Sequence, residues 1–243
     1  MISLDRILSG KPILLTNKVY FYQPTVQEVS DMGESLYWSA INLWSLERKD
    51  MVTQETEQSK QFSDYEIWKM NMFGSEGMKK SLGTACQILL KSKIEFFDYS
   101  GTIYIGEEDS GVFLDEPFYN VMRDICKKII DVCTSASDNK DVQYKETDNM
   151  SEREKEMLQK MRASEKLLEA DDNPHPEDAL GRRILALTAI GKYTLEQVYN
   201  MTMLQINLLL KKYLDIQTFE LQTQLSPYIS SEDKQDKMKS WLD

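Results

Sequence analysis

The N-terminal part of the chain alternates short apolar runs with turn-forming residues. Residues 13–15 and 19–22 are rich in β-branched and aromatic side chains and flank a polar turn, which predicts a β-hairpin. Apolar residues then recur at every third or fourth position over residues 25–44. Thr25 is followed three positions later by Glu28, so we expect one amphipathic helix that begins with a capping box.

Two further helices are predicted before residue 91. Ser63 and Glu66 have the spacing of a capping box and precede a short apolar stretch. Gly74 and Gly77 are expected to separate this short helix from the next one. Residues 78–90 carry apolar side chains at steps of three and four, which is typical of a helix that buries one face.

A second hairpin and another helix complete the N-terminal part. Residues 94–97 and 102–106 have strand-like composition around a glycine-containing turn, and residues 112–114 are a candidate extension of this hairpin. Asp115 is placed to cap the helix that follows, whose apolar face reaches Cys133. We therefore predict one α+β domain over residues 1–134.

The remainder of the chain is predicted to be helical. Residues 135–150 hold few apolar side chains, a composition typical of a polar linker. Helices are then expected over residues 151–170, 179–190, 194–200 and 202–225. The resulting fold class is α+β and mainly helical, with two short β-hairpins in the N-terminal domain and an all-helical C-terminal domain over residues 151–243.

Composition narrows the classes of function. The 243 residues include 29 Lys and Arg against 40 Asp and Glu, which gives a formal net charge of −11. Such a surface repels phosphate groups, so we expect neither nucleic acid nor membrane as a partner. No apolar stretch approaches the length of a membrane span, and the N-terminus lacks the pattern of a signal peptide. We expect a cytoplasmic protein whose three cysteines are reduced and mostly buried.

The residues that usually carry catalysis are sparse. His175 is the only histidine and lies between two prolines, which argues against a histidine-based metal site or catalytic triad. The segment 74–81 lacks the Gly-Lys pair of a phosphate-binding loop, so Lys79 and Lys80 are expected to face solvent. We therefore expect no catalytic residues, no cofactor and no metal.

Methionine provides a more informative pattern. The predicted helix over residues 151–170 is highly charged and has too narrow an apolar strip to lie in a core. Met157, Met161 and Leu168 form that strip, and methionine side chains adapt well to a partner's surface. This strip is a candidate contact surface, and the residues alone indicate an acidic binding or assembly factor.

The order of elements resembles the tail assembly chaperones of long-tailed bacteriophages, in the form common among phages of Gram-positive bacteria. The resemblance lies in the N-terminal hairpin followed by residues 22–29, in the second hairpin with its following helix, and in the tail that ends with Trp241. It is strongest over residues 194–206, where a short helix is followed by Thr202 and by Gln205-Ile206 at the start of the long helix.

The resemblance implies a non-enzymatic protein of the host cytoplasm that is absent from the mature virion. It would form a homo-oligomer, bind and solubilise the tape measure protein, and recruit tail tube protein. A tape measure is a long apolar helix, which aggregates unless its stripe is covered. The expected partner-binding residues are Met157, Met161, Leu168, Thr202, Gln205, Leu209, Tyr213, Phe219 and Trp241.

Two alternatives belong to other functional classes. Residues 138–178 hold 13 Asp and Glu against 7 Lys and Arg, so the chain could be an acidic binding protein or inhibitor that occupies a basic groove on a host protein. The second alternative is a hydrolase or metal-dependent nuclease. It would use the loop carboxylates of Asp171, Asp172, Glu177 and Asp178.

Overall fold

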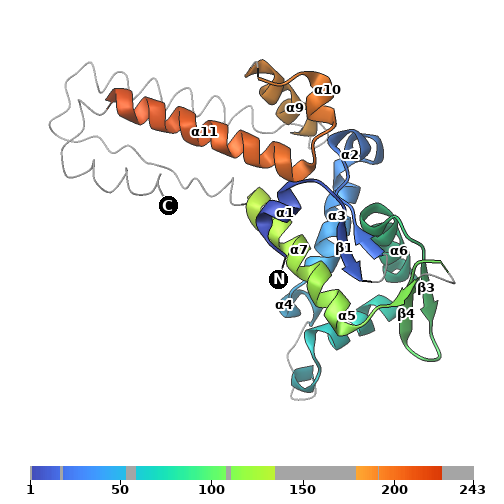
Figure 1. The fold of residues 1–243 in the computed structure, drawn as a ribbon. Helices are drawn as coiled ribbons and strands as arrows, with labels where there is room; N and C mark the ends of the chain where they lie inside the picture. Colours follow the sequence, from blue (N-terminus) through green and yellow to red (C-terminus); the bar gives the residue numbers. More distant parts are fainter. Residues whose placement is uncertain are drawn as a thin grey trace.

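The computed structural model describes residues 2–16, 19–52, 59–107, 111–134, 179–190 and 192–225. Within these ranges the chain is mainly helical and carries two small antiparallel sheets, which confirms the predicted α+β class (Figure 1). The predicted linker over residues 135–150 and the helix over residues 151–170 lie outside the described residues. The division into two domains therefore stays a prediction.

The chain begins with a short helix, the first hairpin and two further helices. The elements are α1 (Leu4–Leu8), β1 (Ile13–Thr16), β2 (Val19–Phe21), α2 (Val26–Met32) and α3 (Glu34–Ser45). Thr25 caps α2 with the predicted capping box. The single helix predicted over residues 25–44 is wrong, because Gly33 has φ of +92° and separates α2 from α3. This conformation is easily reached only by glycine, and it turns the chain between the two helices.

The middle of the chain adds three helices. They are α4 (Arg48–Met51), α5 (Asp64–Phe73) and α6 (Glu76–Leu90), with a 3-10 turn at Ser59–Gln61. The capping box of Ser63 and Glu66 is present, and Gly74 ends α5 as predicted. Gly77, in contrast, lies inside the first turn of α6 and separates nothing. Apolar periodicity does not predict α4, because three of its four residues are charged.

The second sheet has the order β3–β4–β5. Its strands are β3 (Ile94–Phe97), β4 (Thr102–Ile105) and β5 (Val112–Phe113). All neighbours are antiparallel, with Ile94 opposite Ile105 and Tyr104 opposite Phe113. The predicted hairpin is confirmed, and the candidate extension forms the third strand. In Figure 1 this sheet lies at the right-hand margin of the body, beside α6.

The core is built around α7 (Glu116–Thr134), which Asp115 caps through a 2.9 Å hydrogen bond from the Phe118 amide. Against it pack α3 and α5, whose Trp44 and Trp68 rings stack at 5.1 Å. Trp68 Nε1 donates to the Leu43 carbonyl at 2.9 Å, so this indole satisfies its polar group inside the core.

An ion-pair network around Asp64 joins helices beside the core. The Asp64 carboxylate at the start of α5 accepts a hydrogen bond from Arg123 of α7 at 2.8 Å and another from Arg48 of α4 at 3.3 Å. Burial alone would raise the pKa of Asp64, but the two guanidinium groups outweigh it and hold this pKa below its usual value. One carboxylate therefore links three helices.

The C-terminal helices are α9 (Ala179–Ala189), α10 (Leu195–Tyr199) and α11 (Met203–Leu225), as the sequence predicts. Helix α9 packs on α11, and the first turns of α11 lie against α7. Leu204 and Ile206 of α11 are fully buried and belong to the same hydrophobic cluster as the N-terminal helices. Beyond these turns α11 extends away from the body (Figure 1).

Candidate interaction site

Two successive capping boxes shape the segment between α9 and α11. In the first, Gln197 Oε1 accepts from the Thr194 amide at 2.9 Å, and Thr194 Oγ1 accepts from the Gln197 amide at 3.2 Å. In the second, Gln205 Oε1 accepts from the Thr202 amide at 2.8 Å, and Thr202 Oγ1 accepts from the Gln205 amide at 3.3 Å. Each box begins a helix, so the chain turns sharply twice within a few residues.

The second capping box also anchors this segment to the N-terminal helices. Gln205 Nε2 donates to the Leu8 carbonyl at 2.8 Å, and the amide of Val26 donates to the Met201 carbonyl at 2.7 Å. Thr25 and Thr202 form an isolated antiparallel bridge. The start of α11 is therefore held against the ends of α1 and α2, and its geometry is fixed by contacts across the whole chain.

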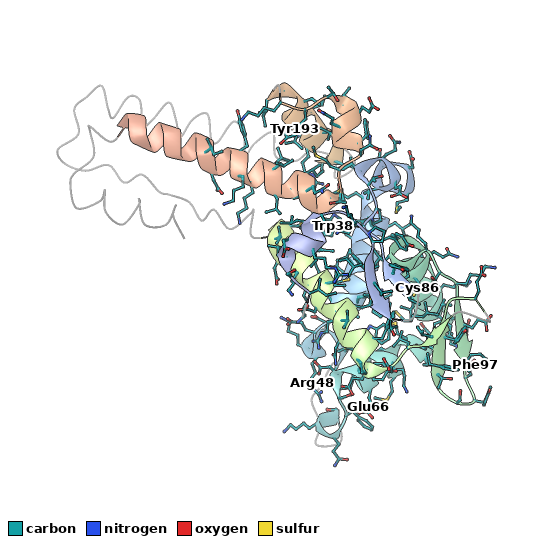
Figure 2. All side chains as sticks on the ribbon, in the orientation of Figure 1. Trp38, Arg48, Glu66, Cys86, Phe97 and Tyr193 are labelled. Atoms are coloured by element: carbon teal, nitrogen blue, oxygen red, sulfur yellow. The ribbon has the colours of Figure 1, made fainter. Side chains whose placement is uncertain are left out.

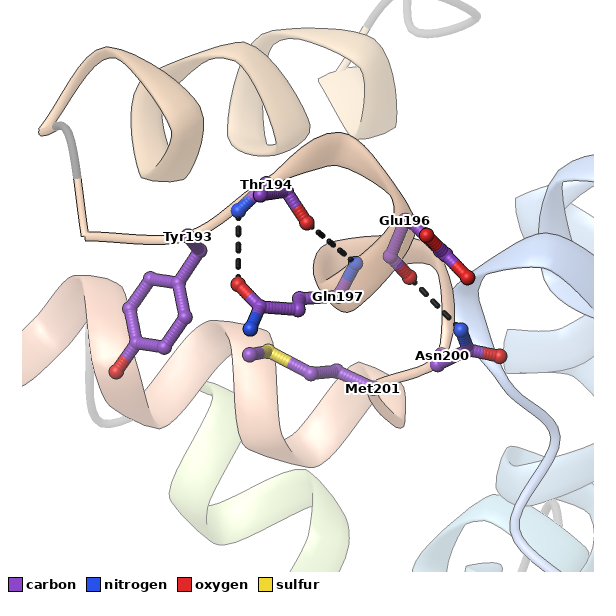
Figure 3. A pocket seen from close by; sticks show the side chains of 6 residues that line it. All are labelled: Tyr193, Thr194, Glu196, Gln197, Asn200 and Met201. Atoms are coloured by element: carbon purple, nitrogen blue, oxygen red, sulfur yellow. Dashed lines mark hydrogen bonds between the residues drawn. The ribbon is translucent and has the colours of Figure 1, made fainter.

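A shallow depression of about 530 Å³ lies on the surface of this segment. In the close view, the Tyr193 side chain lies beside α11 while Gln197 and Met201 face one another (Figure 3). Asn200 Nδ2 donates to the Glu196 carbonyl at 2.9 Å, which fixes one rim of the depression. Its lining is formed by Tyr193, Thr194, Glu196, Gln197, Asn200 and Met201. This open hollow has both polar and apolar lining residues, whereas small-molecule sites are usually enclosed and mostly apolar.

Apolar side chains are exposed on α9 and on α10, two helices that contact each other. Leu185 of α9 is 64% exposed and Leu195 of α10 is 52% exposed. Ala186 and Ala189 share the exposed side of α9, while Leu180, Ile184 and Leu187 on the other side are buried. Helix α9 thus presents small and aliphatic groups to solvent, next to the exposed Arg182. We call these exposed residues of the two contacting helices, Leu185, Ala186, Ala189 and Leu195, together with the depression, the α9–α10 surface.

A polar cluster beneath this surface holds α9 in place. Arg183 forms an ion pair with Glu34 of α3 and donates to Asn207 Oδ1 of α11 at 3.0 Å. Glu34 also accepts from Trp38 Nε1 at 2.8 Å, and Asn207 Nδ2 donates to Cys133 Sγ at 3.2 Å. The two charged side chains are 23% and 19% exposed, so water screens the pair only in part.

The structure places the predicted partner-binding residues in different environments. Thr202 is 4% exposed, and Gln205 is hydrogen-bonded within the chain. Leu209 is partly buried against the core, and Tyr213 is partly exposed on α11. Their role as partner contacts stays a prediction. The side chain of Phe219, and Met157, Met161, Leu168 and Trp241 entirely, lie outside the described residues.

The apolar periodicity of the sequence predicts the buried stripe of α9 but not the α9–α10 surface. A signal was present, because Leu185, Ala186 and Ala189 follow one another at helical spacing with few charges between them. Apolar residues on both sides of a short helix indicate either complete burial or a second contact surface.

The described ranges can also be examined for metal-binding groups, reactive thiols and membrane-spanning helices. Within them, no three His, Cys, Asp or Glu side chains gather in a group that could hold a metal ion. His175 and the four loop carboxylates from Asp171 to Asp178 lie outside these ranges. Burial raises the pKa of the Cys86 and Cys126 thiols, as expected for cysteines in a core. Among the helices that the structure describes, none has the length and apolar character that crossing a bilayer requires.

Lys79 departs from its expected position. Its ammonium pairs with Asp98 at 2.7 Å and with Glu76 at 3.1 Å, and its side chain is only 15% exposed. The expectation that Lys79 faces solvent is therefore wrong, while Lys80 is exposed. The reason is tertiary, because the turn that carries Asp98 folds back onto the first turn of α6.

No family model, curated protein or solved structure matches this chain.

Proposed function

We propose that this chain is a non-enzymatic assembly chaperone of the phage-tail type. It binds and solubilises the tape measure protein as a homo-oligomer and recruits tail tube protein. The observation that carries the proposal is the α9–α10 surface, where Leu185 and Leu195 are more exposed than any other leucine, isoleucine or methionine of the described residues. This surface adjoins residues 194–206, the segment with the strongest resemblance to that family.

The physical argument concerns solubility. An apolar helix aggregates in water unless a partner covers its stripe, and a chaperone must expose apolar groups to provide that cover. Leu185 and Leu195 are exposed for such a contact, while the small side chains of Ala186 and Ala189 allow another helix to approach closely. The formal charge of −11 keeps the loaded complex from aggregating further.

Co-expression with the tape measure protein of the same genome tests the proposal. We expect a soluble complex that contains several copies of this chain, detected by size exclusion with light scattering. The double variant Leu185→Ser/Leu195→Ser should reduce the soluble tape measure fraction at least fivefold. Both side chains are more than half exposed, so these substitutions remove contact area without disturbing the core.

A matched control uses aliphatic residues that are exposed elsewhere. Leu14 is 49% exposed on β1 and Leu36 is 40% exposed on α3, and the variant Leu14→Ser/Leu36→Ser should leave the soluble fraction unchanged. Circular dichroism should show that both double variants are folded. A monomer beside an insoluble tape measure, or equal loss in both double variants, would overturn the proposal.

A further inference from the structure

The sheet β3–β4–β5 has one buried face and one aromatic face. Ile103 and Ile105 of β4 are 1% and 0% exposed and point into the core. The residues that alternate with them point outwards, and the register aligns Glu95, Tyr104 and Phe113 across the three strands. The outward side therefore carries rings where a solvent-facing sheet usually carries polar groups.

The rings on this face contact one another. Phe113 lies 5.2 Å from Tyr104 and 6.5 Å from Phe97, measured between ring centroids, and Phe97 lies 6.3 Å from Tyr99 at the turn. Tyr99 is 91% exposed and Phe113 is 61% exposed, and Phe97 is seen at the outer end of the sheet in Figure 2. We call Phe97, Tyr99, Tyr104 and Phe113 the aromatic face.

Carboxylates adjoin the aromatic face. Glu95 is exposed on β3 directly opposite Tyr104, where cross-strand side chains are in reach of each other. Glu107 is exposed just after β4. Within the described part of the chain neither carboxylate forms an ion pair, and no cation lies over the rings of Phe97, Tyr99 or Phe113. Open π faces beside unpaired carboxylates attract a cationic group.

The buried side of the same sheet shows how such a cation is bound. The Lys79 ammonium lies 5.8 Å from the ring centroids of both Phe73 and Phe96 and pairs with Asp98 at 2.7 Å. Two rings and a carboxylate thus hold one cation from within the chain. The aromatic face offers the same kinds of group to a cation from outside the chain, because it combines aromatic rings with the carboxylate of Glu95.

We propose that the aromatic face docks a cationic segment of a partner protein, whose arginine or lysine side chains lie over the rings and pair with Glu95 and Glu107. Charge complementarity selects this partner, because the chain carries a formal charge of −11 and attracts basic segments over long range. The aromatic face is separate from the α9–α10 surface, so this inference does not depend on the proposed function.

A short amidated peptide of alternating arginine and serine is the probe. Titrated into the isotope-labelled full chain, it should shift the amide signals of residues 95–104 and 111–113. Tyr99→Ser should weaken its affinity about threefold, as expected for the loss of one exposed cation–π contact. Glu95→Gln should weaken it similarly. Tyr99 is almost fully exposed, so its substitution leaves the fold unchanged.

Two controls separate docking from general attraction to an acidic protein. Asp131→Asn removes one exposed carboxylate from α7, far along that helix from β5, and should change the affinity less than 1.5-fold. A peptide with citrulline in place of arginine should not bind. Equal weakening by Asp131→Asn and Glu95→Gln, unchanged affinity in Tyr99→Ser, or signal shifts spread over the acidic surface would each overturn the proposal.

Discussion

Arg183 and Glu34 form an ion pair although they are 149 positions apart in the sequence. The pair joins α9 to the N-terminus of α3, and Asn207 extends it to α11. A carboxylate at the first turn of a helix is also favoured by the helix dipole. This contact therefore fixes the orientation of the helix that carries the α9–α10 surface.

The contribution of this ion pair to stability can be measured by comparing substitutions of Arg183 and of its neighbour Arg182. Arg183→Leu should lower the free energy of unfolding by about 2 kcal/mol, because it leaves Glu34 partly buried without its cation. Arg182→Leu is the control, since Arg182 is exposed on the same helix, and it should change stability by less than about 0.5 kcal/mol. Urea denaturation measures both. Equal effects would show that the pair contributes nothing beyond a surface charge.

The two capping boxes offer a matched comparison of local and tertiary hydrogen bonds. Gln197→Ala removes a box that is bonded only locally and should cost about 0.5–1 kcal/mol of unfolding free energy. Gln205→Ala also removes the 2.8 Å bond to the Leu8 carbonyl and should cost about 1 kcal/mol more. Thermal and urea unfolding should rank the variants in this order, and the reverse order would contradict the tertiary role of Gln205.

The alkaline stability of the protein should depend on Tyr119. This side chain is fully buried, and burial raises its pKa to about 12. The folded state then holds the phenol proton more tightly than the unfolded state, whose tyrosines titrate near pH 10. The stabilisation is complete below pH 10 and is lost as pH rises towards 12.

The substitution Tyr119→Phe should therefore reduce this loss. Between pH 9 and pH 11 the wild type should lose about 1 kcal/mol more unfolding free energy than the variant. Tyr99→Phe removes a hydroxyl from an exposed ring and should behave like the wild type. If urea denaturation at the two pH values gives equal losses for all three proteins, Tyr119 is accessible to solvent in the native state.

The three cysteines should differ in their reactivity. Cys86 and Cys126 are buried, whereas Cys133 is only partly buried and accepts a hydrogen bond from Asn207. Burial raises the pKa of all three thiols, so thiolate is scarce in the folded protein. With a disulfide reagent at pH 8, one thiol should react before unfolding and the other two only in denaturant. Cys133→Ser should abolish the early reaction, and its persistence would contradict this order.

Local interactions explain which elements the sequence could predict. The capping boxes at Thr25, Ser63 and Thr194 each depend on two residues three positions apart, so their spacing is visible in the chain. The strands of the second hairpin were recognisable because their β-branched and aromatic residues lie on either side of a glycine turn. Helix boundaries are harder to predict, because Gly33 divides a continuous apolar pattern that indicates one helix.

The candidate site was only partly predictable. The sequence drew attention to residues 194–206, and the structure places the open depression there. The sequence does not reveal the exposure of Leu185 or Leu195, because the identity of an apolar residue does not say whether another element covers its side chain. The aromatic face could not be predicted from the sequence either, since strand alternation alone does not say which side of the sheet packs on the core.

The fold class, the positions of most helices and strands, and the acidic character of the chain can all be read from the sequence. These follow from short-range patterns and from composition. Tertiary packing is needed to bring Lys79 to Asp98, Arg183 to Glu34, and Gln205 of α11 to the Leu8 carbonyl. Each of these contacts joins groups that are distant in the chain, and their energy arises when packing brings them together and removes water.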